Sequence, residues 1–181
     1  MKKHMRSKPN REINTVNNTE YENCVSDLLA HEMTKMMKNF IQHGNTSCLE
    51  HCINVSYCSY LICKRLGLDY RSAARGGLLH DFFLYDWHVD KPYKGLHGLV
   101  HPRIALQNAS RYFNLNDKEK DIIQKHMWPL TLKPPRYRES FVVLCADKYC
   151  AFRETVTHMG KRYAYKLLTA LGLSFIFKIN R

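Results

Sequence analysis

Apolar positions recur at helical spacing through most of the chain. Between residues 21 and 42 they fall on one face of a helix that ends before Gly44. A second helix begins with Ser47 and Glu50, whose S-x-x-E spacing is typical of a capping box, and its apolar stripe stops near Gly67. The pattern therefore predicts two helices in the first third of the chain.

The later part of the chain continues this helical pattern. A third helix is predicted from about Arg71 to His80, and residues 82–100 are predicted to form a long loop because they contain proline and glycine. Pro102 suits the first turn of a helix and disfavours helical geometry at His101, so a fourth helix is predicted to begin at Pro102. The remaining predicted helices cover residues 116–126, 139–158 and the segment from Lys161 onwards.

No stretch of the sequence alternates between apolar and polar residues as a half-buried strand would. The expected fold is therefore all-α, a compact bundle of about six to seven helices. A length of 181 residues suits one domain. We assign that domain to residues 21–181 and describe residues 1–20 as a basic, flexible tail.

The chain carries a formal net charge of +12, which favours anionic partners such as phosphates, nucleic acid or acidic lipid. Five basic residues and no acid stand in the first eleven positions, without the apolar stretch of a signal peptide. We expect a solvated tail there, with a nucleic-acid-binding arm as the alternative.

The apolar run within residues 165–181 is shorter than the ~20 residues that span a bilayer, so no transmembrane segment is predicted. We expect this segment to pack on the domain or on a dimer partner, with an interfacial membrane helix as the alternative. The oligomeric state is left open.

The seven cysteines are odd in number and form no C-x-x-C pair. They are typical of reduced thiols in a cytoplasmic protein. Cys48 and Cys52 stand four apart and could share a helix face, but no further thiolate pair completes a tetrahedral metal site. We therefore expect them to be small core residues.

One polar pair interrupts an apolar region. In GGLLHDFFLYDWH (residues 76–88), His80 and Asp81 stand between Leu78-Leu79 and a run of aromatic residues that we expect in the core. A buried carboxylate without a partner costs several kcal/mol, so an ion pair, hydrogen bonds or a metal must compensate it. At a helix end, where the chain turns, both side chains can converge on one ion. The sequence therefore indicates a metal anchor.

Further histidine and aspartate residues fall on other predicted elements. His51 lies in the second turn of its helix, His101 precedes the fourth helix, and His126 ends the fifth. Asp147 interrupts FVVLCADKYCAF, the most apolar stretch of the sixth helix, where burying a carboxylate is again expensive. His97 lies four residues before His101. Because the helix is predicted to begin at Pro102, the two histidines are not expected to share a helix face. We therefore expect His97 beside the site or exposed.

The order H…HD…D on successive helices, with LLHD after a glycine pair, resembles the HD-domain metal-dependent phosphohydrolase superfamily over about residues 45–155. HGLVHP and IIQKHMW are similar to the segments that supply further ligands in its two-metal members, and the chain looks like a small single-domain bacterial HD protein. The GYP motif of cyclic-dinucleotide phosphodiesterases is absent. The resemblance implies one ion on His51, His80, Asp81 and Asp147, and a second on Asp81, His101 and His126.

Nitrogen and oxygen ligands of this kind suit Fe, Mn, Co, Ni or Zn. The resemblance implies that two such divalent ions activate water for attack on phosphorus, with Asp81 bridging them. Lys148, beside Asp147, is the first candidate to contact phosphate and protonate a leaving group. The other candidates for substrate binding are Arg153, Arg103, Lys125, Asp86 and His88.

Three functions are compatible with these residues. The first is a metal-dependent phosphohydrolase or phosphodiesterase acting on a nucleotide or another small phosphate ester; a nucleic-acid substrate is not favoured. The second is a di-iron oxygenase, because some HD relatives use nearly the same ligand set. The third is a nucleotide-binding module without turnover, which would predict missing ligands, and none is missing.

Overall fold

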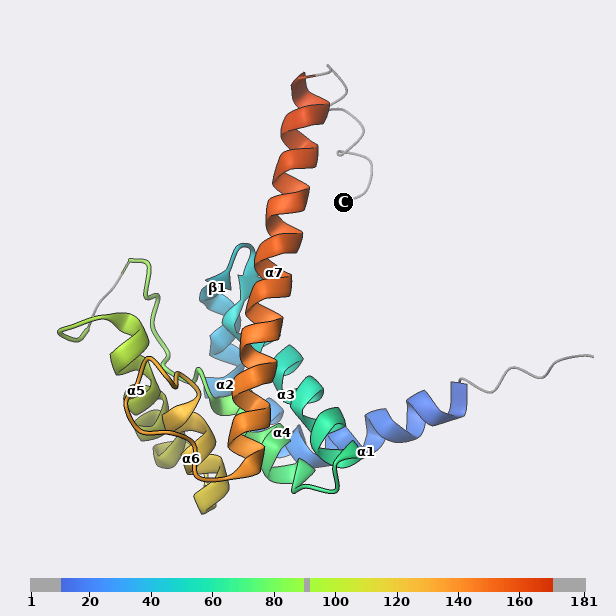
Figure 1. Cartoon of the computed structure of the whole chain (residues 1–181), viewed down its shortest axis with the longest axis vertical. Coiled ribbons are helices and arrows are strands. Elements are labelled where there is room, and N and C mark those ends of the chain that lie inside the picture. The colour runs from blue at the N-terminus through green and yellow to red at the C-terminus, as the bar shows by residue number, and fades with distance from the viewer. Residues whose placement is uncertain (1–10, 90–91, 171–181) are drawn as a thin grey trace, which may run out of the picture.

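The computed structural model describes residues 11–89 and 92–170, and Figure 1 shows their arrangement. Seven α-helices and one two-stranded antiparallel hairpin occur in these ranges, which confirms the predicted all-α class. The elements, in chain order, are α1 (Arg11–Ala30), α2 (Glu32–Met36), the 3-10 helix η1 (Met37–Asn39), β1 (Ile41–His43), β2 (Thr46–Ser47), α3 (Cys48–Arg65), α4 (Tyr70–Leu79), α5 (His97–Tyr112), α6 (Asp117–Lys125) and α7 (Arg138–Ala170).

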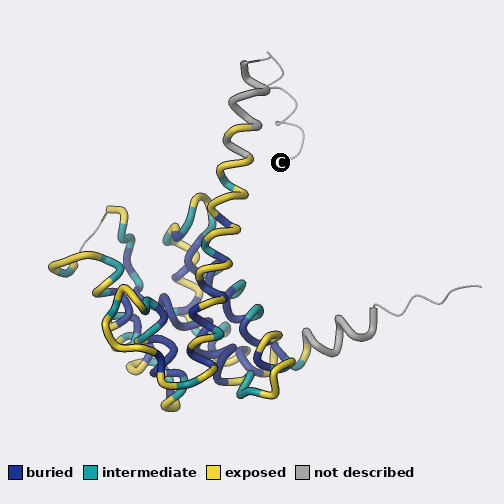
Figure 2. The backbone as a smooth tube through the Cα atoms, viewed as in Figure 1, coloured by how far each residue is buried: buried dark blue, intermediate teal, exposed yellow. Residues whose placement is uncertain are grey.

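Helices α3 and α4 form the centre of the body, and Figure 2 shows the buried residues gathered there. The predicted capping box opens α3: the Ser47 hydroxyl accepts a hydrogen bond from the Glu50 backbone N–H, and the Glu50 carboxylate accepts one from the Ser47 backbone N–H. Asn116 and Glu119 open α6 in the same way. Cys48 and Cys52 are fully buried, as are Phe82 and Phe83, which confirms their expected place in the core.

The first predicted helix is wrong in its extent. α1 ends at Ala30, and a second short helix starts after His31, whose Nδ1 accepts a hydrogen bond from the Met33 backbone N–H. The hairpin β1–β2 follows, turning at Gly44 with a positive φ of 62°. Strands of three and two residues are too short to give an alternating pattern, so their sequence carried no strand signal.

The start of α5 also differs from the prediction. The helix begins at His97, not at Pro102, so the expected loop is shorter and His97 shares a helix with His101. Their rings stack with centroids 4.5 Å apart. Pro102 is the sixth residue of the helix; it cannot donate a hydrogen bond to the Gly98 carbonyl, and its ring crowds that carbonyl. The packing of the buried residues of α5, including Ala105 and Ala109, must offset this cost.

The first described helix begins earlier, and the last one ends later, than the pattern predicted. α7 continues without a break to Ala170, so the separate last helix predicted from Lys161 is wrong. Its second half runs away from the body, where the described residues are mostly exposed (Figure 2). α1 begins at Arg11, inside the stretch assigned to the tail. Residues 1–10 and the C-terminal segment 171–181 lie outside the described residues.

Among the described residues, no helix is both long and apolar enough to cross a membrane.

Close packing of α3 on α4 yields a test of the fold. A Cβ added at Gly77 would stand 3.0 Å from the Ser56 Cα, which is backbone that cannot move aside cheaply. We expect Gly77→Ala to lower the free energy of unfolding by about 1–3 kcal/mol. Thermal unfolding followed by circular dichroism would measure this.

Gly160→Ala is the matched control, because nothing lies within 4 Å of that position on exposed α7. Alanine forms helices better than glycine, so this variant should be as stable as the wild type or up to about 1 kcal/mol more stable. A Gly77→Ala protein as stable as the wild type would contradict the packing argument.

Candidate metal centre

The HD pair stands where α4 gives way to irregular chain. His80 is the C-cap of α4, and Asp81 follows it at the turn. Both side chains are buried, with His80 0% and Asp81 3% exposed. Because the helix ends here, the two side chains face a common space; His80 Nε2 lies 3.3 Å from Asp81 Oδ2. The geometry expected for a metal anchor is therefore present.

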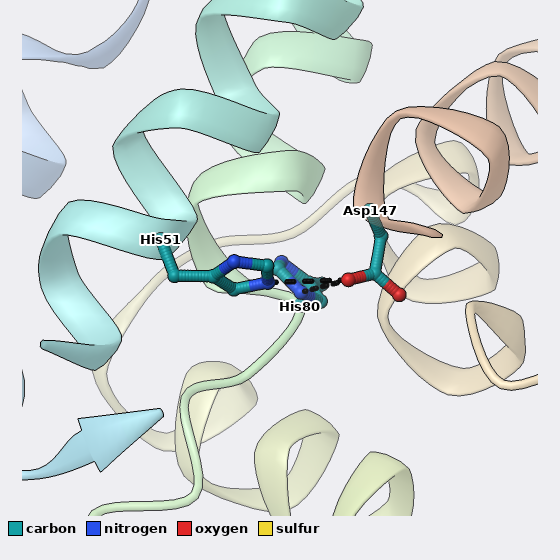
Figure 3. A group of neighbouring side chains, drawn as sticks. All are labelled: His51, His80 and Asp147. Carbon is teal, nitrogen blue, oxygen red and sulfur yellow. Dashed lines mark hydrogen bonds and ion pairs between the residues drawn. The ribbon is translucent and has the colours of Figure 1, made fainter. Parts of the chain in front are cut away.

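One cluster of ligand atoms joins α3, the end of α4 and α7, as Figure 3 shows. Asp147 Oδ1 lies 3.1 Å from His51 Nε2 and 3.7 Å from His80 Nε2. All three residues are buried, and their ligand atoms lie within 4.8 Å of one another. These three side chains could hold a metal ion.

A second cluster lies on the other side of the Asp81 carboxylate. Asp81 Oδ1 is 3.1 Å from His101 Nε2 and 3.4 Å from His126 Nε2, while Oδ2 faces His80. His80, Asp81 and His126 form a second group of buried ligand atoms within 4.8 Å. α5 contributes His101 and the end of α6 contributes His126. The six residues that the resemblance implied as ligands are thus brought together.

Backbone carbonyl groups orient the imidazole rings of three of these histidines. The Nδ1 atoms of His80, His101 and His126 lie 2.8–2.9 Å from the backbone carbonyl oxygens of Gly77, His97 and Ile123 respectively. An Nδ1–H that donates to a carbonyl leaves Nε2 with its lone pair toward the cluster, as metal-binding histidines require. His97 therefore belongs beside the site, as one of the two expected alternatives.

His51 is oriented by a carboxylate. Its Nδ1 lies 2.9 Å from Glu154 Oε2, and the other oxygen of Glu154 accepts a hydrogen bond from Asn54 Nδ2. Burial opposes protonation of His51, but Asp147 and Glu154 together raise the pKa of its imidazole to about 9. Glu154 was missed in the sequence, although it stands seven positions after Asp147 and so on the same face of α7.

The close approach of the His101 and His126 rings indicates that a cation fits between them. His101 Nε2 lies 2.8 Å from His126 Nε2. With both Nδ1 hydrogens donated to carbonyls, two lone pairs face each other, and burial lowers the pKa of His126 to about 4, which opposes a shared proton. His80 Nε2 and Asp81 Oδ1 also have no hydrogen-bond partner. A bound cation would satisfy all four atoms, so the donor set fits metal ions.

The carboxylates carry the charge that such ions need. Burial opposes ionisation of Asp81 and Asp147, but the histidines around them hold the pKa of each carboxyl well below its usual range. Gln42 Nε2 donates a further hydrogen bond to Asp81 Oδ2. Both aspartates are therefore anionic ligands near neutral pH.

A cavity of about 310 Å³ opens onto these ligands. Gln42 and His43 of β1 line it, together with Trp87 and Lys148. Gln42 and His43 were not predicted as site residues, because the apolar pattern indicated a helix that extended to this region. Lys148 Nζ lies 2.8 Å from Asp147 Oδ2 and is about half exposed, so its ammonium stands at the rim of the cavity.

The other predicted substrate residues lie elsewhere. Asp86 and His88 pair with each other in the loop and do not line this cavity, although Trp87 between them does. Arg153 lines a separate hollow, and Arg103 and Lys125 line another one. Only Lys148, among the residues proposed for substrate binding, borders the metal-facing cavity.

Comparison with known proteins gives a short match. No family model matches the chain, and no solved structure matches it. The sequence is 42% identical over 57 residues to ribonuclease Y of Clostridium perfringens, in three strains. That match covers 32% of this chain and 11% of the relative, so the chain spans about a tenth of that protein's length. The chain is thus similar, over a third of its residues, to part of a ribonuclease.

Proposed function

We propose that this chain is a metal-dependent phosphohydrolase or phosphodiesterase of the HD type, acting on a nucleotide or another phosphate ester. The observation that carries the proposal is the convergence of five buried histidine and aspartate side chains around the Asp81 carboxylate, which makes six ligand residues in all. The partial similarity to a protein named ribonuclease Y agrees with a phosphodiester substrate.

Each residue has a definite part in the proposed site. His51, His80 and Asp147 would hold one ion and His101 and His126 the other. Asp81 would serve both, since its two oxygens face different histidines. Divalent Fe, Mn, Co, Ni or Zn in such a site supplies a Lewis acid and acidifies water near neutral pH.

Lys148 is proposed to neutralise a phosphate oxygen and to donate a proton to the leaving group. Its ammonium at the rim already pairs with Asp147, and it lies 3.5 Å from Met127 Sδ. A phosphate entering the cavity would meet this cation before it meets a buried ligand. Trp87, which is partly buried, lines the same cavity.

The ligand set predicts the metal content. Protein purified without chelators should hold close to two transition-metal ions per chain, measured by plasma mass spectrometry. Asp81→Ala should remove both, because its carboxylate faces both clusters, whereas His126→Ala should deplete mainly one. Asp86→Ala removes a carboxylate outside the cavity and should keep both ions. Full retention of metal in Asp81→Ala would refute the assignment.

Lys148→Ala should lower kcat or raise KM for a nucleotide without changing metal content. A charge-assisted hydrogen bond contributes about 1.5–3 kcal/mol, so the loss in kcat/KM should be about tenfold or more. Arg153→Ala removes a cation of the same helix that borders another hollow, and it should have little effect. Equal activity of Lys148→Ala and the wild type would exclude Lys148 from the site.

Anaerobic turnover separates a hydrolase from an oxygenase, since both need the same ligands. A hydrolase uses its ions as Lewis acids, so Mn- or Co-loaded protein should release phosphate or a nucleoside monophosphate from a nucleotide panel without oxygen. Activity restricted to the iron form, with stoichiometric oxygen consumption, would reverse the assignment. Binding without any turnover would instead support a nucleotide-binding module.

A further inference from the structure

A second hollow lies beside the metal centre, between α5 and the segment that joins α6 to α7, which lie side by side in Figure 1. Its volume is about 470 Å³. Its apolar surface is aliphatic and comes from Leu99, Pro102, Leu130 and Leu132. We call this hollow the basic groove, because its lining also contains Arg103, Lys125 and Lys133 and no acidic residue.

The basic groove and the metal-facing cavity share a wall. Gly98 and Met127 line the cavity, and the Leu130 side chain of the groove packs against Gly98: a Cβ there would stand 2.8 Å from Leu130 Cδ2. His101 faces the metal cluster, while the next residue, Pro102, lines the groove. A ligand that extends from the cavity past this wall would therefore enter the groove directly.

A substrate larger than a simple phosphate ester would extend beyond the cavity. At about 310 Å³ the cavity stands at the lower end of ligand-pocket volumes, roughly 300–1,000 Å³, and metal ions would take part of it. A different hollow is lined by the carboxylates of Glu50 and Glu154 as well as by the cation of Arg153. The lining of the basic groove contains cations and no acidic residue, so the groove attracts phosphates more strongly.

We infer that the basic groove binds a single nucleic-acid strand whose scissile phosphate lies at the metal centre. This inference rests on the proposed function and names its substrate class. A nucleoside monophosphate has its one phosphate at the metal ions and no further phosphate for the cations of the groove. A strand places further phosphates along the groove, and its riboses and bases cover the aliphatic surface between them.

The three cations of the groove differ in whether they already form an ion pair within the protein. Lys125 Nζ lies 2.7 Å from Asp121 Oδ1, so it is partly neutralised and helps to hold α6. Arg103 and Lys133 are both exposed. These two residues are therefore the ones to change, and their replacement leaves the buried residues untouched.

The test compares two substrates on the Mn-loaded full-length chain. Bis(p-nitrophenyl) phosphate has one phosphodiester and no further phosphate that could bind in the groove. A uridylate hexanucleotide has further phosphates along its strand that could bind there. In the double variant Arg103→Ala/Lys133→Ala, kcat/KM should fall at least tenfold for the hexanucleotide and stay within about twofold for the small ester. Binding of the hexanucleotide to the full-length chain, measured by fluorescence anisotropy without turnover, should weaken in the same variant, and the log–log slope of its binding constant against salt should fall by about 1.4, roughly 0.7 for each lost phosphate contact.

The matched control is Arg111→Ala/Lys120→Ala, which removes two exposed cations of α5 and α6 outside the groove. Its hexanucleotide kcat/KM should stay near the wild-type value, so that loss of net charge alone is excluded. Leu132→Ser, at a side chain 96% exposed, should raise KM for the hexanucleotide without affecting folding.

Several outcomes would overturn the inference. Wild-type protein that cleaves the small ester but not the hexanucleotide would refute the groove and leave the proposed function standing. An equal loss on both substrates, or an equal loss in the control, would also refute it. Failure to cleave either substrate would reject both the proposed function and the groove.

Discussion

The carboxylate of Asp81, held away from water among histidine rings, is the constraint on which the rest of the structure depends. An ionised carboxylate in such a place is costly unless it is paired and hydrogen-bonded. Here Gln42 donates to one oxygen, and three imidazoles lie within 3.1–3.4 Å of the carboxylate. Each partner comes from a different element, so the position of one charge fixes how β1, α4, α5 and α6 meet.

The need to hold His80 and Asp81 in place also explains the small and charged residues around the site. Gly77 lets α4 approach the backbone of α3 near Ser56, which keeps His80 close to His51. On the opposite side of α4, Arg75 pairs with Glu119 of α6 and Asp27 of α1. α4 is therefore fixed by a contact on one face and by ion pairs on the other, and the residue at its end has little freedom to move.

Much of this arrangement could be read from the sequence, because it depends on residues with strong local preferences. Ser47 and Glu50, and likewise Asn116 and Glu119, mark helix starts by their side-chain chemistry alone. His80 and Asp81 are conspicuous because they interrupt apolar runs. Other features depend on tertiary contacts and leave no local trace. His97 is helical despite the proline five residues later, and the hairpin that supplies Gln42 is too short for a periodic pattern. Arg153 is a different case: it stands six residues after Asp147, so helix periodicity already turns it away from that side chain and toward another hollow.

α7 connects the buried charges with the outside of the molecule. At 33 residues and about 1.5 Å per residue, it is a rod of about 50 Å. Asp147 and Glu154, both in contact with His51, stand in its first half, and its second half leaves the body. The two carboxylates that orient His51 therefore stand on the same uninterrupted helix as the residues that project furthest from the body, so the candidate site and this projection are parts of one structural element.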